Sequence, residues 1–267
     1  MSDQDHVIPG SNRSDEAAQG HWLLARAGKK VLRPGGRELT NWLLDRLPVN
    51  GHDVVEFAPG LGITAVELIN CRPKTYRGVE QDSDAVAMVS SKIPADDNHR
   101  IVNRSAADSG LEAESADVVI GEAMLTMTTN EHKLEIMREA HRLLRSGGLY
   151  AIHELALQPD DLADETKQDI QRALARSIKV NARPLTGSEW EELGRQAGFS
   201  PECHRFEAMA LLEPKRLLAD EGIKGTATII FNVLRNKDLR KRVLNMRRCF
   251  SDNKEHLRAI GVVFVKP

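Results

Sequence analysis

The sequence lacks paired cysteines, long apolar stretches and an excess of charge of either sign. Its three cysteines are far apart and form no Cys-x-x-Cys motif, so neither a zinc site nor a disulfide framework is indicated. No apolar run approaches the ~18 residues that a membrane-spanning helix needs. The 37 Lys and Arg nearly balance the 39 Asp and Glu, so no overall field points to nucleic acid or to an anionic membrane. We therefore predict a protein without a metal and without a membrane partner.

The first fifty residues differ from the rest of the chain. Their polar, acidic start is unlike a signal peptide, which begins basic and continues apolar; with the cysteine usage, this predicts a cytoplasmic protein. A loose tail is expected over residues 1–14, followed by helical patterns over 16–30 and 37–47. We predict that residues 1–50 form a tail and a helical cap on a main domain that covers 51–267.

From residue 52 onward, short apolar runs alternate with helical patterns, which is typical of βαβ units and of a mostly parallel sheet with helices on both faces. The predicted strands are 53–57, 75–79, 100–102, 117–120, 149–153, 201–206 and 260–265. The predicted helices are 63–70, 82–92, 131–145 and 187–197. Two helical insertions, at about 160–180 and 208–257, are expected to form a lid over the carboxyl ends of the strands, where open α/β sheets bind ligands.

One loop has the composition of a cofactor-binding turn. Gly60 and Gly62 lie where the first strand passes into a helix, and glycine there allows a tight turn and close approach to a bulky ligand. Glu80 ends the second strand, where a carboxylate can accept two hydrogen bonds from a ribose diol. The segment Gly60-Leu-Gly62-Ile-Thr-Ala65 also satisfies the dinucleotide fingerprint. The loop alone is therefore compatible with S-adenosylmethionine (SAM) and with a nicotinamide dinucleotide.

Two features near the loop favour SAM. Glu56, four residues before Gly60, suits a ligand with a cationic amino group and repels a pyrophosphate. About fifty residues precede the first strand, whereas dinucleotide folds often begin with it. The order of motifs farther along the chain supports the same choice.

The chain resembles the class I SAM-dependent methyltransferases, most closely the branch with the ubiquinone- and menaquinone-biosynthesis enzymes and similar small-molecule enzymes (methyltransferase type 11). The acid-x-Gly-x-Gly-x-Gly loop of that branch is matched by Glu56-Phe-Ala58-Pro-Gly60-Leu-Gly62, and its second-strand acid by Glu80. Its third segment aligns without gaps onto Ser105-Ala106 through Asp117, and its helix and Gly-Gly strand onto Arg138 through Ile152. The resemblance covers roughly residues 33–157 and the final strand. It implies a Rossmann-like sheet of seven strands with an antiparallel last strand, SAM binding and methyl transfer.

The expected cofactor contacts come from the loop, from the two acids and from their neighbours. They are Glu56, Ala58, Pro59, Gly60, Gly62, Thr64, Glu80, Gln81, Ser105, Ala106, Glu122 and Arg33. Three of these positions depart from the family pattern. Ala58 replaces the first glycine, at small cost because of its size, and Pro59 removes an N–H. Ser105 stands where the family usually has an Asp that binds the adenine amino group, and its hydroxyl can still accept that bond.

Residues at the ends of later strands are candidates for the chemistry. Methyl transfer from a sulfonium needs mainly that nucleophile and methyl be held in line, and a base is required only if the acceptor loses a proton. His153 and Glu154 end the fifth strand and are the candidate catalytic residues; the alternative is that His153 packs in the sheet and Glu154 caps or meets solvent. Glu122 can touch the methionine part of the cofactor or the acceptor, and Arg33 can pair with the cofactor carboxylate.

The segment 235–248 contains seven Lys and Arg residues against one acid, Asp238. It is either the solvated face of an amphipathic helix or a site for an anionic small molecule or RNA. Only Phe231 and Phe250 are close enough in sequence to stack bases. The Asn/Asp-Pro-Pro-Tyr/Phe motif, usual in enzymes that methylate nucleobase amino groups, is absent after the fourth strand. A nucleic-acid partner is therefore not expected.

We predict a SAM-dependent methyltransferase that acts on a small molecule, anionic if the basic segment contacts it. Two alternatives remain: a nicotinamide-dependent oxidoreductase that uses the same loop, and a SAM- or RNA-binding module without catalysis. The acceptor, its nucleophilic atom and the oligomeric state stay open, because a fold does not fix its substrate.

Overall fold

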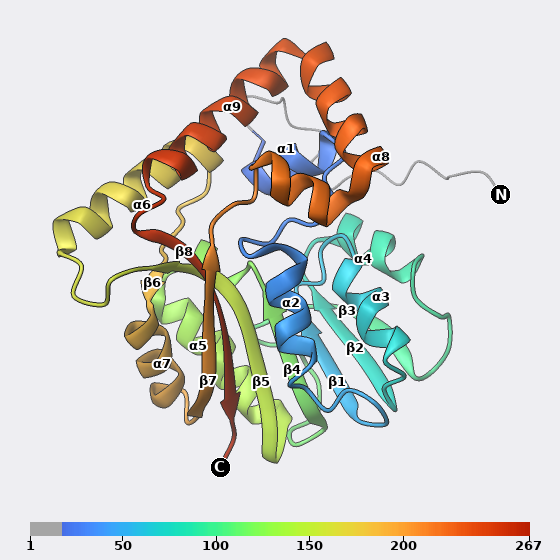
Figure 1. The fold of residues 1–267 in the computed structure, drawn as a ribbon. Helices are drawn as coiled ribbons and strands as arrows, with labels where there is room; N and C mark the ends of the chain where they lie inside the picture. Colours follow the sequence, from blue (N-terminus) through green and yellow to red (C-terminus); the bar gives the residue numbers. More distant parts are fainter. Residues whose placement is uncertain (1–17) are drawn as a thin grey trace.

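The computed structural model describes residues 18–267, and their secondary structure follows the predicted alternation (Figure 1). Seven strands form a continuous sheet in the order β3-β2-β1-β4-β5-β8-β7. Their bounds are β1 (Asp53–Phe57), β2 (Thr75–Glu80), β3 (His99–Asn103), β4 (Ala116–Glu122), β5 (Leu144–Leu157), β7 (Ser200–Ala208) and β8 (Leu257–Val265). The pairings from β3 through β5 are parallel, and β8 is antiparallel to both β5 and β7. The predicted α/β class and the antiparallel last strand are confirmed.

Two details of the sheet differ from the prediction. The two-residue strand β6 (Leu185–Thr186) pairs with the end of β5, beside the main path, and makes an eighth strand within the described residues. Two residues are too few to show a period in the sequence. β5 is also much longer than the predicted 149–153, because its second half stays paired with β8 as far as Leu157.

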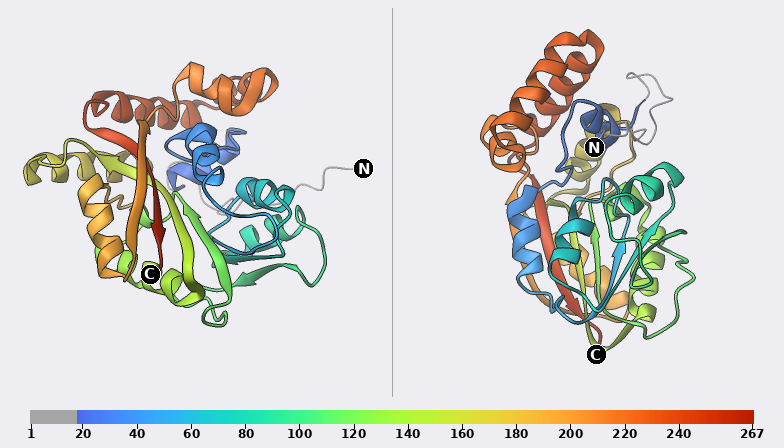
Figure 2. Two further views of the ribbon diagram at one scale, coloured as in Figure 1. Left: turned by 60° about the horizontal axis from the view of Figure 1, so that its bottom comes forward. Right: turned by 90° about the vertical axis from the view of Figure 1, so that its right-hand side faces the viewer.

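Helices cover both faces of the sheet, as the views in Figure 2 show. One face packs against α2 (Gly36–Leu44), α3 (Ile63–Asn70) and α4 (Ser83–Ser90), and the other against α5 (Asn130–Leu143) and α7 (Gly187–Gln196). The short 3-10 helix η1 (Leu125–Met127) follows β4. Side chains fix three of the helix starts: Asp82 caps α4, Thr129 caps α5, and Thr186 with Glu189 forms a capping box on α7.

Four helices lie above the carboxyl ends of the parallel strands (Figure 1). They are α1 (Gly20–Arg26), α6 (Asp164–Ile178), α8 (Pro214–Arg235) and α9 (Lys237–Asp252). Both predicted helical insertions are present, and the four helices share an apolar core of their own that includes Leu24, Leu174, Ile229 and Met246. We call these four helices the lid. No helix of residues 18–267 is long and apolar enough to cross a bilayer.

The N-terminal segment is divided between the lid and the sheet. α1 packs against α6 and α9, whereas α2 lies against β5, β8 and α8. The domain boundary near residue 50 therefore stays a prediction. The expected tail over residues 1–14 and the start of the first expected helix lie outside the described residues.

Candidate functional site

The loop between β1 and α3 turns tightly by placing three residues at positive φ. Ala58 has φ +52°, Gly60 +55° and Gly62 +71°, in the left-handed region that favours glycine. The Ala58 N–H donates to the carbonyl of Val79 on β2 at 2.8 Å, which fixes the start of the turn to the sheet. The alanine at position 58, where the family has glycine, therefore strains the backbone. The sequence predicted a small cost from the size of the side chain, but the cost comes from the positive φ.

This loop forms one wall of a cavity of about 760 Å³ at the carboxyl ends of β1, β2 and β4. Eleven of the twelve expected cofactor-binding residues line it. They are Arg33, Glu56, Ala58, Pro59, Gly60, Thr64, Glu80, Gln81, Ser105, Ala106 and Glu122. Gly62 is the exception: it is the N-cap of α3, and a Cβ on it would meet the Val89 side chain at 3.3 Å. Its glycine is needed for the backbone and for packing against α4, not for contact with the cavity.

Glu80 is held in place by the backbone around it. Its two oxygens accept from the N–H groups of Gly60 at 3.2 Å and Asp82 at 3.0 Å, and the residue is only 7% exposed. Burial raises the pKa of this carboxyl above its usual range, although the backbone donors oppose that shift. Each carboxylate oxygen has a second lone pair, so Glu80 can accept from a diol in the cavity without losing its backbone contacts.

Glu56 lies deeper, and it is protonated at neutral pH. Burial raises the pKa of this carboxyl to about 8, against the opposing effect of the Tyr76 hydroxyl, which donates to it at 2.6 Å. A cationic ligand beside Glu56 favours the charged form and lowers that pKa. The expected attraction for a cationic amino group is therefore coupled to release of a proton.

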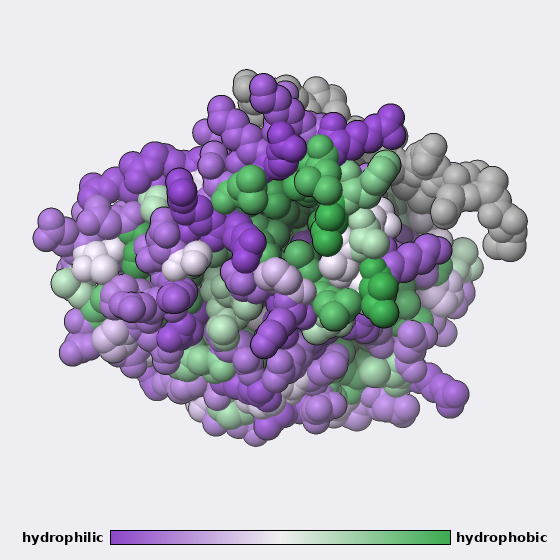
Figure 3. Space-filling view, turned by 45° about the horizontal axis from the view of Figure 1, so that its top comes forward, coloured by the Kyte–Doolittle hydropathy of each residue, from purple (hydrophilic) through white to green (hydrophobic). Residues whose placement is uncertain are grey.

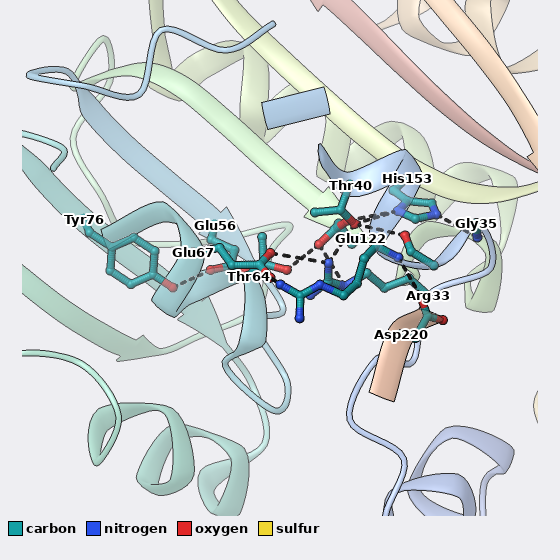
Figure 4. Close-up of polar contacts among 12 residues, drawn as sticks. Arg33, Gly35, Thr40, Glu56, Thr64, Glu67, Tyr76, Glu122, His153 and Asp220 are labelled. Carbon is teal, nitrogen blue, oxygen red and sulfur yellow. Dashed lines mark hydrogen bonds and ion pairs between the residues drawn. The ribbon is translucent and has the colours of Figure 1, made fainter. Parts of the chain in front are cut away.

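Glu122 is the centre of a buried polar network (Figure 4). Thr40 and Thr64 donate hydroxyl hydrogen bonds to its two oxygens, each at 2.5 Å. The Arg33 guanidinium lies 3.3 Å from it, and Nδ1 of His153 lies 2.9 Å from it. Burial alone would raise the pKa of Glu122, but the charge of Arg33 and the His153 contact outweigh burial and lower it to about 2. This network fastens the N-terminal segment to the ends of β4 and β5.

Comparison with known proteins agrees with this geometry. Residues 55–152 match a family described as a methyltransferase domain. An uncharacterized protein of Haemophilus influenzae is 34% identical over 251 residues, which cover 91% of this chain and 96% of that protein. This chain belongs to the class I methyltransferases.

Two solved structures share the fold of this methyltransferase at low sequence identity. The MccD protein matches with a TM-score of 0.67 at 19% identity, covering 88% of this chain and 99% of that one. The phosphoethanolamine N-methyltransferase 2 of Haemonchus contortus, solved with SAM, matches with a TM-score of 0.70 at 16% identity, covering 100% of this chain and 60% of that one. The methyltransferase domain favours SAM over a nicotinamide dinucleotide, the two cofactors that the glycine loop alone left open.

The two predicted catalytic residues of the methyltransferase are buried and hydrogen-bonded to groups of the protein itself. His153 is 0% exposed; its Nε2 accepts from the Gly35 N–H at 3.0 Å and its Nδ1 faces Glu122. Glu154 is 0% exposed as well and accepts from the backbone N–H groups of Met124, Leu125 and Thr126 and from the Thr126 hydroxyl. His153 lines neither cavity, so a role as base for the acceptor does not fit its placement, whereas the alternative that it packs in the sheet does. Glu154 also lines the smaller cavity described next, and its role as a base stays a prediction.

A second, smaller cavity of about 70 Å³ adjoins the first, below α9. Its lining is almost entirely apolar and includes Leu24, Leu155, Met246 and Phe250. The two cavities share the lining residues His21, Leu32, Ala123, Met127 and Val180. The smaller cavity therefore lies directly beside the larger one.

His21 is the polar side chain at the junction of the two cavities. It forms no hydrogen bond with any residue in 18–267. Burial lowers the pKa of its imidazole to about 4, although Asp82 opposes that shift, so the ring is neutral at pH 7. The sequence shows that a histidine is present near the start of the chain. Its position between the two cavities depends on how α1 folds back over the sheet.

The charged side chains of the basic segment 235–248 lie apart from both cavities. Met246 is the member of this segment that lines the smaller cavity, and no Lys or Arg of the segment lines either of them. No group of three or more metal-ligating side chains occurs within the described part of the chain.

Proposed function

We propose that this methyltransferase binds SAM in the larger cavity and transfers its methyl group to a small, largely apolar acceptor in the smaller one. The observation that carries this proposal is that a cavity lined by carboxylates and a mostly apolar cavity lie side by side and share five lining residues. The acceptor proposed here is apolar, rather than anionic, because the basic segment 235–248 lines neither cavity with a charged side chain.

The charges in the larger cavity support SAM over a dinucleotide. Five acidic residues line it, Glu56, Glu80, Asp82, Asp84 and Glu122, and Arg33 is already paired with Glu122. A pyrophosphate there would meet these acidic residues, with the exposed Lys30 as the lining Lys or Arg outside the Arg33–Glu122 pair, whereas a ligand with an ammonium, a sulfonium and a ribose diol finds acceptors for each. When bound, SAM supplies an electrophilic methyl group on a positively charged sulfur.

The chain itself contributes positioning. The loop at Gly60 and the carboxylate of Glu80 hold the nucleoside end, and the apolar walls of the smaller cavity exclude water from the acceptor. The neutral imidazole of His21 stands where it can accept a hydrogen bond from the acceptor's nucleophilic O–H or N–H. This aligns a lone pair with the methyl carbon and gives the departing proton a place to go.

Binding and transfer are tested separately. Calorimetry with S-adenosylhomocysteine and with NAD tests the cofactor, and only the first is expected to bind. Radiolabelled methyl transfer from SAM to lipid-soluble and water-soluble metabolite fractions tests the acceptor, and label is expected in the lipid-soluble fraction. Binding of NAD alone would refute the cofactor assignment, and label confined to water-soluble anions would refute the acceptor class.

The His21→Ala variant tests the junction. We expect its affinity for S-adenosylhomocysteine to stay within about threefold of wild type, while methyl incorporation falls by about 100-fold, the typical contribution of a proton-accepting side chain. The exposed His52, which lines neither cavity, gives the matched control His52→Ala, expected to keep both properties. Unchanged incorporation in His21→Ala would remove this residue from the mechanism.

A further inference from the structure

The outer face of α8 and α9 exposes large apolar side chains. Within the described residues, all large hydrophobic side chains that are exposed lie on these two helices. They are Leu218, Ile223, Ile230, Phe231, Leu234 and Leu244, and Ile223 is 81% exposed. Such a concentration is unusual for a surface that meets only water and marks a site of interaction. We call it the outer lid face.

The spacing of three of these residues shows that they form one stripe along the part of α8 that follows Gly222. Ile223, Ile230 and Leu234 are separated by seven and then four residues, which places them on the same side of a helix. The opposite side already has its partner: Ile229 is buried in the lid core, and Asn232 donates to the carbonyl of Ala27 at 3.1 Å. The outer stripe is thus a second apolar side on a helix whose inner side already packs against the lid core and α1.

Positive charge surrounds this stripe. Residues 214–252 contain ten Lys and Arg against four Asp and Glu, in a chain whose net charge is −2. Five of the ten, Arg235, Lys237, Arg240, Lys241 and Arg248, are exposed and form no ion pair within the described residues. Figure 3, which looks onto the top of the molecule, shows hydrophobic side chains gathered near its centre with hydrophilic ones around them.

We propose that the outer lid face docks onto the surface of an anionic lipid bilayer, with the α8 stripe inserted at the level of the headgroups. Aliphatic and aromatic side chains on one side of a helix, bordered by Lys and Arg, are the chemistry that binds such a surface. The sequence predicted no membrane partner because it has no long apolar run, but peripheral docking needs no membrane span.

Two other occupants fit the face less well. In a symmetric dimer the same patch meets itself, so the unpaired Arg and Lys residues of the two copies would face one another and repel. RNA would match the charge, but it offers no apolar surface for Ile223, Ile230 and Leu234 to bury against, and Phe231 is the exposed aromatic residue available for stacking.

The docking surface and the apolar cavity lie on two sides of α9. Met246 and Phe250 of α9 wall the cavity, while Leu244 and its basic neighbours on the same helix face outward. A docked lid therefore brings the apolar cavity next to the bilayer, where an apolar acceptor dissolves. Docking itself does not rest on the proposed function, because it requires neither SAM nor an acceptor.

Vesicle flotation with the full-length protein tests the proposal. One set of vesicles is phosphatidylcholine with about one third phosphatidylglycerol, and the other is phosphatidylcholine alone. We expect at least about tenfold stronger binding to the anionic set, and a loss of that binding as salt is raised.

Two variants separate the apolar and the electrostatic contributions. Phe231→Ser combined with Leu234→Ser removes most of the stripe, and Arg240→Gln combined with Lys241→Gln removes two charges; each is expected to weaken binding by about tenfold or more. The control Arg100→Gln with Arg104→Gln removes two exposed charges at the β3 edge of the sheet and is expected to bind like wild type. All of these side chains are exposed, so the thermal midpoint should change little.

Several outcomes would overturn the proposal. They are equal binding to neutral and anionic vesicles, no binding to either, and an equal loss of binding in the two outer-lid-face variants and in the β3-edge control. A concentration-dependent dimer that the Phe231→Ser, Leu234→Ser variant dissociates, without vesicle binding, would assign the face to a second copy. Salt-dependent RNA binding with no vesicle binding would assign it to RNA. Loss of methyl transfer without loss of vesicle binding would concern the proposed function alone.

Discussion

Ala58 and Glu80 set the shape of the cofactor loop from its two ends. The N–H of Ala58 is tied to β2, and the carboxylate of Glu80 accepts the N–H of Gly60, so the turn is held by one hydrogen bond on either side of Pro59. At the residue scale the loop is therefore organised before any ligand enters. This preorganisation reduces the conformational entropy that the loop loses when a ligand binds.

Ala58→Gly is expected to stabilise the protein slightly. An alanine at φ +52° costs about 1 kcal/mol in the left-handed region, while glycine is more costly to order from the unfolded chain. Urea unfolding should show an increase of up to about 1 kcal/mol. The control Ala227→Gly, at an exposed position in α8, should lose about that amount, since glycine disfavours helices. Equal losses in the two variants would contradict the strain at position 58.

Glu80→Ala is expected to weaken the binding of S-adenosylhomocysteine by about 100-fold or more, because two charge-assisted hydrogen bonds to the ribose are lost. Glu80→Gln keeps one acceptor oxygen and should lose less. Calorimetry measures both affinities, and circular dichroism checks that the sheet is intact. If Glu80→Ala binds as tightly as wild type, the diol is held elsewhere.

At the scale of elements, a buried charged cluster fastens α8 to the N-terminal segment. Glu221 of α8 accepts from the backbone N–H groups of Lys30 at 3.0 Å and Val31 at 2.9 Å, and from the Lys29 ammonium at 3.3 Å. Burial lowers the pKa of Lys29, against the opposing effect of Glu221 and Asp220. The helix is interrupted at the next residue, Gly222, with φ +70°. The break lets the first turns of α8 hold this cluster while the rest follows α9.

Glu221→Ala is expected to reduce the free energy of unfolding by about 2–4 kcal/mol, because it leaves two backbone donors and part of a buried ammonium charge without an acceptor. The matched control is Glu213→Ala, which removes an exposed pair with Arg247 at 3.4 Å and should change stability by less than about 0.5–1 kcal/mol. Urea denaturation of both variants measures the difference. Similar values for the two would show that the cluster does not hold the lid.

At the scale of the whole molecule, stability should fall as pH rises through the neutral range. The folded-state pKa of Glu56 is about 8, against a usual value of 4.5, so between those values the native state holds a proton that the unfolded state has released. Rising pH then favours the unfolded state. Two groups act in the opposite direction at lower pH: Glu122, with a folded pKa of about 2, below pH 4.5, and His21, with a folded pKa of about 4 against a usual 6.5, up to about pH 6.5.

The Glu56→Gln variant isolates this contribution. Wild type is expected to lose up to about 1.4 kcal/mol per pH unit between pH 5 and 8 relative to the variant, measured as the difference of their urea unfolding free energies. In the same range the affinity of wild type for SAM should rise with pH, because a cation beside Glu56 expels the proton. Parallel stability profiles for the two proteins would show that Glu56 ionises normally.

Periodicity predicted most of the architecture of this protein. The seven main strands and the lid insertions follow from apolar patterns within short windows, and such patterns reflect which face each segment buries. β6 was missed because its two residues carry no pattern, and the length of β5 because it depends on pairing with β8, about a hundred residues away.

The sequence by itself determined the fold class and identified eleven of the residues that line the larger cavity. A glycine turn and the acids at strand ends are local features, and parallel strands bring them to one edge. Only the tertiary structure decided that His153 and Glu154 face inward to Gly35, Glu122 and the η1 backbone, and that His21 faces the junction of two cavities. The physical reason is that a side chain's role depends on which partners satisfy it, and here those partners are 28 to 118 positions away.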